Sequence, residues 1–108
     1  MVSRLRVLRC WRRYVEVVVE AVKRVVPEAR VYLVGGAAEG RLTVLSDIDI
    51  VVVLPKTLSL EEAAELRARI WEEAEKLGLP LYAPIDLHFT DREGLQRYMR
   101  RGRVIELS

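Results

Sequence analysis

The sequence predicts an α/β (α+β) domain in which helices pack on one sheet of three to four strands, in the order αβ(α)βαβα. Segments with apolar residues at three- and four-residue steps, typical of helices, alternate with short apolar segments typical of strands. Hydrophobic residues make up 51% of the 108 residues, which is enough for one small core. We therefore expect a single domain over residues 1–108.

The first predicted element is a long amphipathic helix that ends at Pro27. Its apolar face consists of Leu5, Leu8, Trp11, Val15, Val18, Val22 and Val25. The two tryptophans, Trp11 and Trp71, lie on helical patterns and are interpreted as core or interface residues. The first helix also carries many arginines, which indicate either a solvated surface or a contact for phosphate or an acidic partner.

Two short strands are predicted next. Residues 30–35 form an apolar strand that stops at the pair Gly35-Gly36, and residues 47–54 form the second strand. Residues 37–41, between them, are predicted to make one helical turn. Ser46 precedes the second strand and is interpreted in two ways, as a hydrogen-bonding residue of the turn or as a residue that lines a phosphate site.

The second half of the chain begins with a clear helix signal. Ser59 followed by Glu62 is the capping-box arrangement, and Gly78 marks the end of the helix that it starts. The elements predicted after it are a strand over 84–90, a basic helix over 91–101 and a tail strand over 103–107.

Composition limits the setting of the protein. Cys10 is the single cysteine, so no intrachain disulfide is expected and a reducing, cytoplasmic location is predicted. Charged residues such as Glu16 and Lys23 interrupt the Val-rich segment, so we expect no membrane span. Asparagine is absent and glutamine occurs once, a depletion of heat-labile amides that favours a thermophilic source.

The most informative feature for function is the triplet Asp47-Ile48-Asp49 at the head of an apolar strand. Side chains alternate along a strand, so both carboxylates are predicted to share one face, roughly 7 Å apart. Charges in such a place are retained only when they are paired, hydrogen-bonded or bound to metal. Converging carboxylate oxygens suit one or two Mg²⁺ ions that also bind substrate phosphates.

The predicted third strand adds a third carboxylate. Asp86 lies within an apolar strand, and it would reach the same metals if that strand lies beside the second. His88 shares its face, but without other His or Cys ligands it is interpreted as a partly buried structural residue. Three carboxylates, two metals and a Gly-Gly turn predict phosphoryl or nucleotidyl transfer of the two-metal type.

These residues resemble the nucleotidyltransferase-fold, polymerase-β-like superfamily, and within it most closely the small minimal nucleotidyltransferases. The signature is a Gly-Gly or Gly-Ser pair, a spacer near ten residues and Asp-x-Asp, and the resemblance covers residues from about 30 to 90. The matching residues are Gly35, Gly36, Gly40, Ser46, Asp47, Ile48, Asp49, Ile50 and Asp86. The resemblance implies that superfamily's fold, with a small mixed sheet.

The resemblance also implies roles for these residues. Asp47, Asp49 and Asp86 would be catalytic and would ligate two Mg²⁺ ions that bridge ATP or another nucleoside triphosphate. Binding of that nucleotide would fall to Gly35, Gly36, Ser46 and Arg41. The products implied are pyrophosphate and AMP joined to a hydroxyl of a partner protein, a HEPN-domain toxin for which this chain would be the antitoxin. A homodimer or a complex with that partner would complete the site, and no nucleic acid is expected.

The chain also departs from the pattern of the family. Gly36 stands where many relatives have Ser, and Ala37 and Glu39 stand where basic residues are common. These changes predict weaker triphosphate binding and leave a second interpretation open, a binding module that neutralises its partner without catalysis. A third interpretation, an RNA-directed transferase, draws on the basic first helix, in which Arg9, Arg12 and Arg13 would contact RNA.

Overall fold

A computed structural model describes residues 4–43 and 46–108 of the chain, with side chains from Cys10 onward. Its elements, in order, are α1 (Arg4–Val25), β1 (Arg30–Val34), α2 (Gly35–Ala38), β2 (Ile48–Val53), α3 (Leu60–Lys76), β3 (Ile85–Thr90), α4 (Arg92–Arg101) and β4 (Ile105–Glu106). The order αβ(α)βαβα is confirmed, and the predicted tail strand is present as the short β4.

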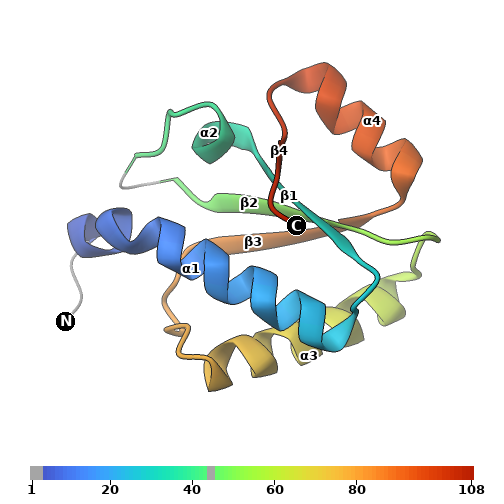
Figure 1. Cartoon of the computed structure of the whole chain (residues 1–108), viewed down its shortest axis with the longest axis horizontal. Helices are drawn as coiled ribbons and strands as arrows, with labels where there is room; N and C mark the ends of the chain where they lie inside the picture. Colours follow the sequence, from blue (N-terminus) through green and yellow to red (C-terminus); the bar gives the residue numbers. More distant parts are fainter. Residues whose placement is uncertain (1–3, 44–45) are drawn as a thin grey trace.

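The strands form one mixed sheet in the order β3-β2-β1-β4 (Figure 1). β1 pairs antiparallel with both of its neighbours, whereas β2 and β3 are parallel. Parallel neighbours need a long crossover, and α3 supplies it. The parallel register places Asp49 opposite Asp86 and Val51 opposite His88. The sheet therefore brings together the two strands that carry the predicted metal ligands.

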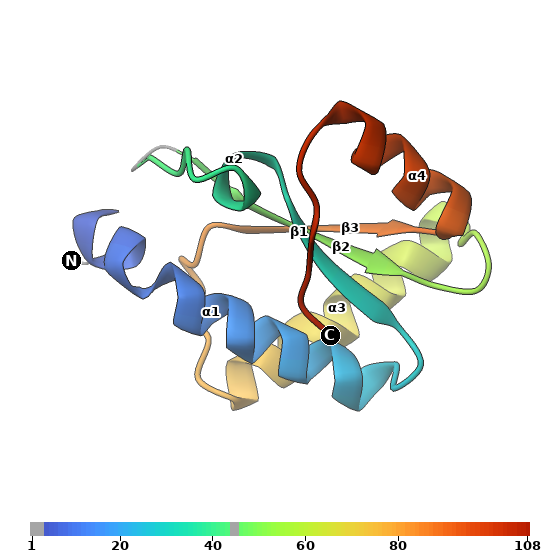
Figure 2. The ribbon, with the colours of Figure 1, turned by 45° about the horizontal axis from the view of Figure 1, so that its top comes forward.

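Helices cover the two faces of the sheet unequally. α1 and α3 pack against each other on one face, and α4 alone lies on the other face, where it contacts β2 and β3 (Figures 1 and 2). The amphipathic pattern of α1 explains its place, because its apolar stripe must be buried. None of the described helices has the length and hydropathy needed to cross a membrane.

The predicted alternation of β2 is confirmed. Ile48, Ile50 and Val52 point into the main core under α1 and α3, which Trp11 and Trp71 also contact. Val51 and Val53 point to the other face, where they pack with Val34 and Leu95. One strand thus supplies two different environments through its period of two.

Both of the later helices have side-chain caps. The Ser59 hydroxyl accepts a hydrogen bond from the Glu62 N–H at 3.1 Å, and the Glu62 carboxylate accepts one from the Ser59 N–H at 3.0 Å. This is the predicted capping box of α3. At α4, the Asp91 carboxylate accepts hydrogen bonds from the Gly94 N–H at 2.9 Å and from the Thr57 hydroxyl at 2.7 Å.

The region between β1 and β2 differs in detail from the prediction. The helical turn spans Gly35–Ala38 rather than residues 37–41, because it starts directly at the glycine pair. Backbone bonds from the Glu39 N–H to the Gly35 carbonyl, at 3.2 Å, and from the Arg41 N–H to the Gly36 carbonyl, at 2.7 Å, close the turn. Because the turn begins at Gly35, it follows β1 with no residue between them.

Candidate functional site

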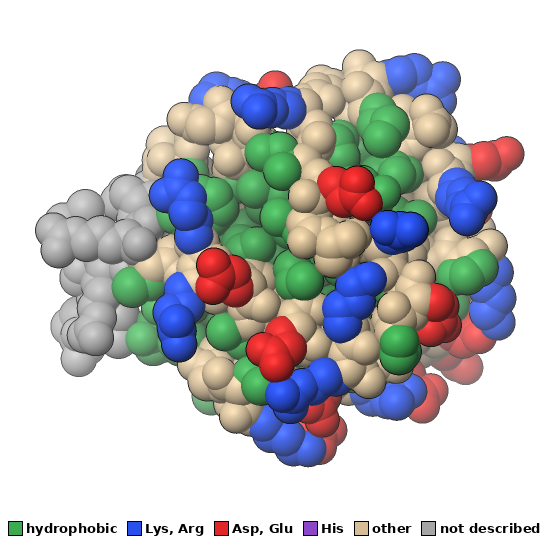
Figure 3. All heavy atoms as spheres, viewed as in Figure 1, with side chains coloured by type: hydrophobic (Ala, Val, Ile, Leu, Met, Phe, Trp, Pro, Cys, Tyr) green, Lys and Arg blue, Asp and Glu red, His purple; other side chains and the backbone are tan. Residues whose placement is uncertain are grey.

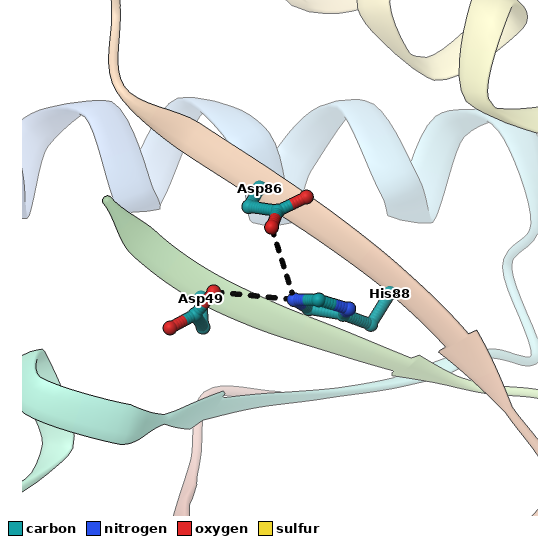
Figure 4. Close-up of side chains that lie close together, drawn as sticks. All are labelled: Asp49, Asp86 and His88. Carbon is teal, nitrogen blue, oxygen red and sulfur yellow. Dashed lines mark hydrogen bonds and ion pairs between the residues drawn. The ribbon is translucent and has the colours of Figure 1, made fainter.

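Three side chains converge on the face of the sheet that α4 covers (Figure 4). They are Asp49 from β2 and Asp86 and His88 from β3, and we call them the Asp–His cluster. His88 Nε2 lies 3.1 Å from Asp49 Oδ1 and 3.4 Å from Asp86 Oδ2. One ligand atom from each residue lies within 4.8 Å of the other two. The cluster therefore has the compactness that a single divalent cation requires.

The cluster is open to solvent. The exposed fractions of the side chains are 33% for Asp49, 36% for His88 and 54% for Asp86. The ring of Tyr98, on α4, lies 6.3 Å from the His88 ring and limits its access from that side. Two carboxylates and an imidazole fit a divalent metal ion, and their exposure leaves room for water and substrate ligands.

Asp47, also predicted as a metal ligand, is not part of the Asp–His cluster among the described residues. β2 begins at Ile48, so Asp47 lies just before the strand with an exposed side chain. The alternation that predicts a shared face for both aspartates applies only within the strand. Its role as a metal ligand stays a prediction, whereas the pairing of Asp49 with Asp86 agrees with the expected adjacency of the two strands.

His88 is partly buried, as expected, and its interpretation as a structural residue stays a prediction. Sequence reasoning did not anticipate its contacts: Nε2 lies within hydrogen-bond distance of Asp49 Oδ1 and 3.4 Å from Asp86 Oδ2. The signal that could have found it is the spacing Asp86-x-His88, which puts both side chains on one face of β3. The parallel register with β2 then brings that face beside Asp49.

The glycine turn lies directly against the Asp–His cluster. Gly35 has φ +70, and a Cβ at this position would lie 2.7 Å from Asp49 Oδ2. Only glycine permits both the left-handed backbone and this close approach. A Cβ on Gly36 would meet only the Arg41 carbonyl oxygen, at 3.6 Å, so the missing side chain there has no steric cause.

The two other predicted nucleotide-binding residues have partners of their own. The Ser46 hydroxyl accepts a hydrogen bond from the Thr43 N–H at 3.1 Å, which agrees with its interpretation as a turn residue. The Arg41 guanidinium pairs with the Glu39 carboxylate. This hydrogen bond and the positive charge of Arg41 are the main reasons why the pKa of Glu39 is lowered.

A pocket of about 310 Å³ adjoins the Asp–His cluster. Its lining residues are Val34, Gly35, Glu39, Asp49, His88, Tyr98, Arg101, Gly102 and Arg103. We call it the cluster pocket. Potential metal ligands, the glycine turn and two arginine residues contribute to this single concave surface.

A larger hollow of about 600 Å³ lies between α1, α2 and β4. Figure 3 shows hydrophobic side chains gathered in this part of the surface, with charged groups of both signs around them. Trp11, Leu42 and Ile105 are among its lining residues. Among the described residues, metal-ligating groups converge at the cluster pocket and not at this hollow, so the chemistry belongs to the smaller pocket.

A family model for the nucleotidyltransferase domain matches residues 15–105. The chain belongs to this nucleotidyltransferase family. The match spans the glycine turn and every member of the Asp–His cluster. Members of the family generally use a nucleoside triphosphate and a divalent metal ion, which is the chemistry that the cluster pocket is suited to hold.

Two solved structures can be compared with this chain. A proposed nucleotidyltransferase from Sulfolobus solfataricus superimposes with a TM-score of 0.63 and 18% identity over 98% of this chain and 87% of that one. This likeness shows the nucleotidyltransferase fold. Another proposed nucleotidyltransferase has a TM-score of 0.49 and 27% identity over 82% of this chain and 91% of that one. None of the curated proteins matches the chain.

Proposed function

We propose that this nucleotidyltransferase moves AMP from ATP onto a hydroxyl group of a partner protein, with Mg²⁺ ions held by Asp47, Asp49 and Asp86. The observation that carries the proposal is the convergence of Asp49 and Asp86 beside the Gly35 turn. A metal at this point would neutralise charge on the triphosphate and polarise the phosphorus that is attacked.

The residues of the chain divide the work. Asp49 and Asp86 would offer carboxylate oxygens to the metal, and His88 Nε2 lies within reach of both carboxylates. The backbone of Gly35 and Gly36 lies at the start of a helical turn, where N–H groups can face phosphate oxygens. Asp86, the most exposed of the three, would also accept the proton of an incoming hydroxyl.

The acceptor that we propose is a protein, a HEPN-domain toxin that the modification would neutralise. The openness of the Asp–His cluster supports a large acceptor, because Asp86 is 54% exposed and accessible from solvent. The partner itself would then complete the site.

A second candidate function has its own observation. Glu39 lines the cluster pocket, and its negative charge opposes triphosphate binding. A non-catalytic module would keep the fold and neutralise its partner by forming a complex. The two functions differ in whether a covalent bond to the partner is formed.

The deciding experiment incubates the protein with Mg²⁺, ATP labelled at the α-phosphate and a HEPN-domain partner. We expect label on the partner, and we expect Asp49→Asn to reduce its transfer by more than about 100-fold, the upper range for losing a group that only supports a metal ligand. Glu65→Gln, an exposed carboxylate on α3, is the matched control and should transfer label at the wild-type rate. No label on a partner that is nevertheless neutralised would establish the binding module instead.

Thermal unfolding of the same variants, measured with and without Mg²⁺, tests the metal-ligand roles of Asp49 and Asp47 separately. Mg²⁺ should raise the unfolding temperature of the wild type and of Glu65→Gln but not that of Asp49→Asn, because a ligand stabilises the state that binds it. Asp47→Asn tests whether Asp47 also holds metal. An equal Mg²⁺ shift in Asp49→Asn and the wild type would contradict the metal site.

A further inference from the structure

The segment that leaves α4 contributes two arginines to the cluster pocket. Arg101 ends the helix, Gly102 follows, and Arg103 leads toward β4. Both guanidinium-bearing residues are exposed, and both line the same pocket as Asp49 and His88. They lie far along the chain from the glycine turn, where Ala37 and Glu39 stand in place of the basic residues that are common in relatives.

Glu39 connects this segment to the turn that follows α2. A Cβ on Gly102 would lie 3.1 Å from Glu39 Oε1, so the carboxylate lies directly against the segment. After the Arg41 side chain, the Arg103 backbone is a further group that lowers the pKa of the Glu39 carboxyl. The Glu39 carboxylate therefore lies against the backbone between the two arginines.

Charge explains why the arginines matter to a ligand. The acidic groups that line the cluster pocket, Glu39 and Asp49, repel an anion, whereas Arg101 and Arg103 attract one. A guanidinium group presents a planar fork of donors that matches phosphate oxygens, often with two parallel hydrogen bonds. Arg41 is already paired with Glu39 and is not among the residues that line the pocket.

We propose that Arg101 and Arg103 bind the terminal phosphates of the nucleoside triphosphate, and that Glu39 is a positioning residue that holds their backbone in place. The positive charge missing after Gly36 is then supplied from the C-terminal side of α4. This inference rests on the proposed function for the identity of the nucleotide. The anion-binding step itself can be measured separately.

Calorimetric titration with inorganic tripolyphosphate tests the arginines without a nucleoside or a transfer step. Arg101→Ala and Arg103→Ala should each weaken binding by about tenfold or more, as expected for loss of a charge-assisted hydrogen bond. Arg100→Ala is the matched control, because Arg100, the neighbour of Arg101 on α4, lines a separate hollow with Glu93, Gln96 and Arg97. Its affinity should stay within about twofold of the wild type, since the distant charge acts through screened solvent.

The direction in which substitution of Glu39 changes tripolyphosphate affinity tests its positioning role. Removal of a nearby negative charge alone would tighten anion binding, whereas loss of an anchor would weaken it. We expect Glu39→Ala to bind tripolyphosphate more weakly than the wild type, and Glu39→Gln, which keeps an oxygen acceptor for Arg103, to recover part of the loss. Tighter binding by Glu39→Ala would overturn the positioning role.

The outcomes separate this inference from the proposed function. If tripolyphosphate binds the double variant Arg101→Ala/Arg103→Ala within twofold of the wild type, or does not bind the wild type, the arginine site is wrong even if label transfer succeeds. If binding depends on both arginines but the wild type transfers no label, the site stands and the transferase proposal fails. Thermal melts of every variant check that each one is folded.

Discussion

The two faces of the sheet use the same strands for different purposes. The face under α1 and α3 is a continuous apolar core, and the described residues include no fully buried polar or charged side chain. The face under α4 has a much smaller apolar cluster and carries the three members of the Asp–His cluster. A single helix leaves part of that face open, and the charged groups occupy the uncovered part.

The comparison shows how a small domain separates stability from chemistry. In β2, Ile50 contacts the main core, while its neighbours Asp49 and Val51 face α4. A polar side chain that is open to water therefore lies one residue away from a side chain that is fully buried. Substitutions on the two faces should accordingly have separable effects, on the free energy of unfolding for one and on ligand binding for the other.

The largest expected effect on stability is at the main core. Ile50 is 0% exposed, so Ile50→Ala should lower the free energy of unfolding by about 2–5 kcal/mol through lost burial and a residual cavity. Urea denaturation measures it, and the folded variant should keep the Mg²⁺-induced thermal shift. A cost below about 1 kcal/mol would contradict the view that this face provides most of the stability.

A smaller effect is expected at the turn that contacts the other face. Gly35→Ala should cost about 1–2 kcal/mol for its left-handed backbone, and the new Cβ should also displace the Asp49 carboxylate and reduce the Mg²⁺-induced shift. Gly40→Ala is the matched control, because Gly40 has φ +71 but nothing within 4 Å of the added Cβ. Equal Mg²⁺ shifts in the two variants would show that the contact with Asp49 is unimportant.

The smallest effect concerns the cap of α4 and its pH dependence. The hydrogen bond from the Gly94 backbone, followed by that from Thr57, lowers the pKa of Asp91 in the folded protein. The ionised Asp91 therefore contributes its full stabilisation above the unfolded pKa of about 3.9. This stabilisation is lost as the pH falls through the lower folded pKa. Asp91→Ala should therefore lower the unfolding temperature at pH 7. The difference from the wild type should shrink in acid, and a constant difference down to the lowest measurable pH would contradict the assignment.

Much of the fold follows from local patterns in the sequence. The capping residues Ser59 and Glu62 and the alternation of β2 depend on neighbours in the chain, so they were predictable. The sequence does not specify the adjacency of Asp49 and Asp86, because the pairing of β2 with β3 depends on how the α3 crossover packs. The presence of Asp49 in an otherwise apolar strand favours a site on the face that α4 covers, which stays a prediction.

The rest depends on contacts between distant segments. The role of His88 needs the parallel register, which no local pattern specifies. The contribution of Arg101 and Arg103 needs the path of the chain after α4, and a short basic helix has many possible positions on a sheet. α2 starts at Gly35, so the two glycines are the first residues of the helical turn rather than a break between the strand and the turn.

The parallel register of β2 and β3 also has a consequence for the order of folding. Asp49 and His88 are separated by 39 positions in the chain, so the Asp–His cluster forms only after the loop that contains α3 has closed. At that moment two carboxylates come to lie directly opposite each other on adjacent strands, an arrangement that disfavours pairing. The His88 imidazole lies between the two carboxylates, with Nε2 3.1 Å from Asp49 Oδ1 and 3.4 Å from Asp86 Oδ2, so the paired strands hold a polar group in contact with both.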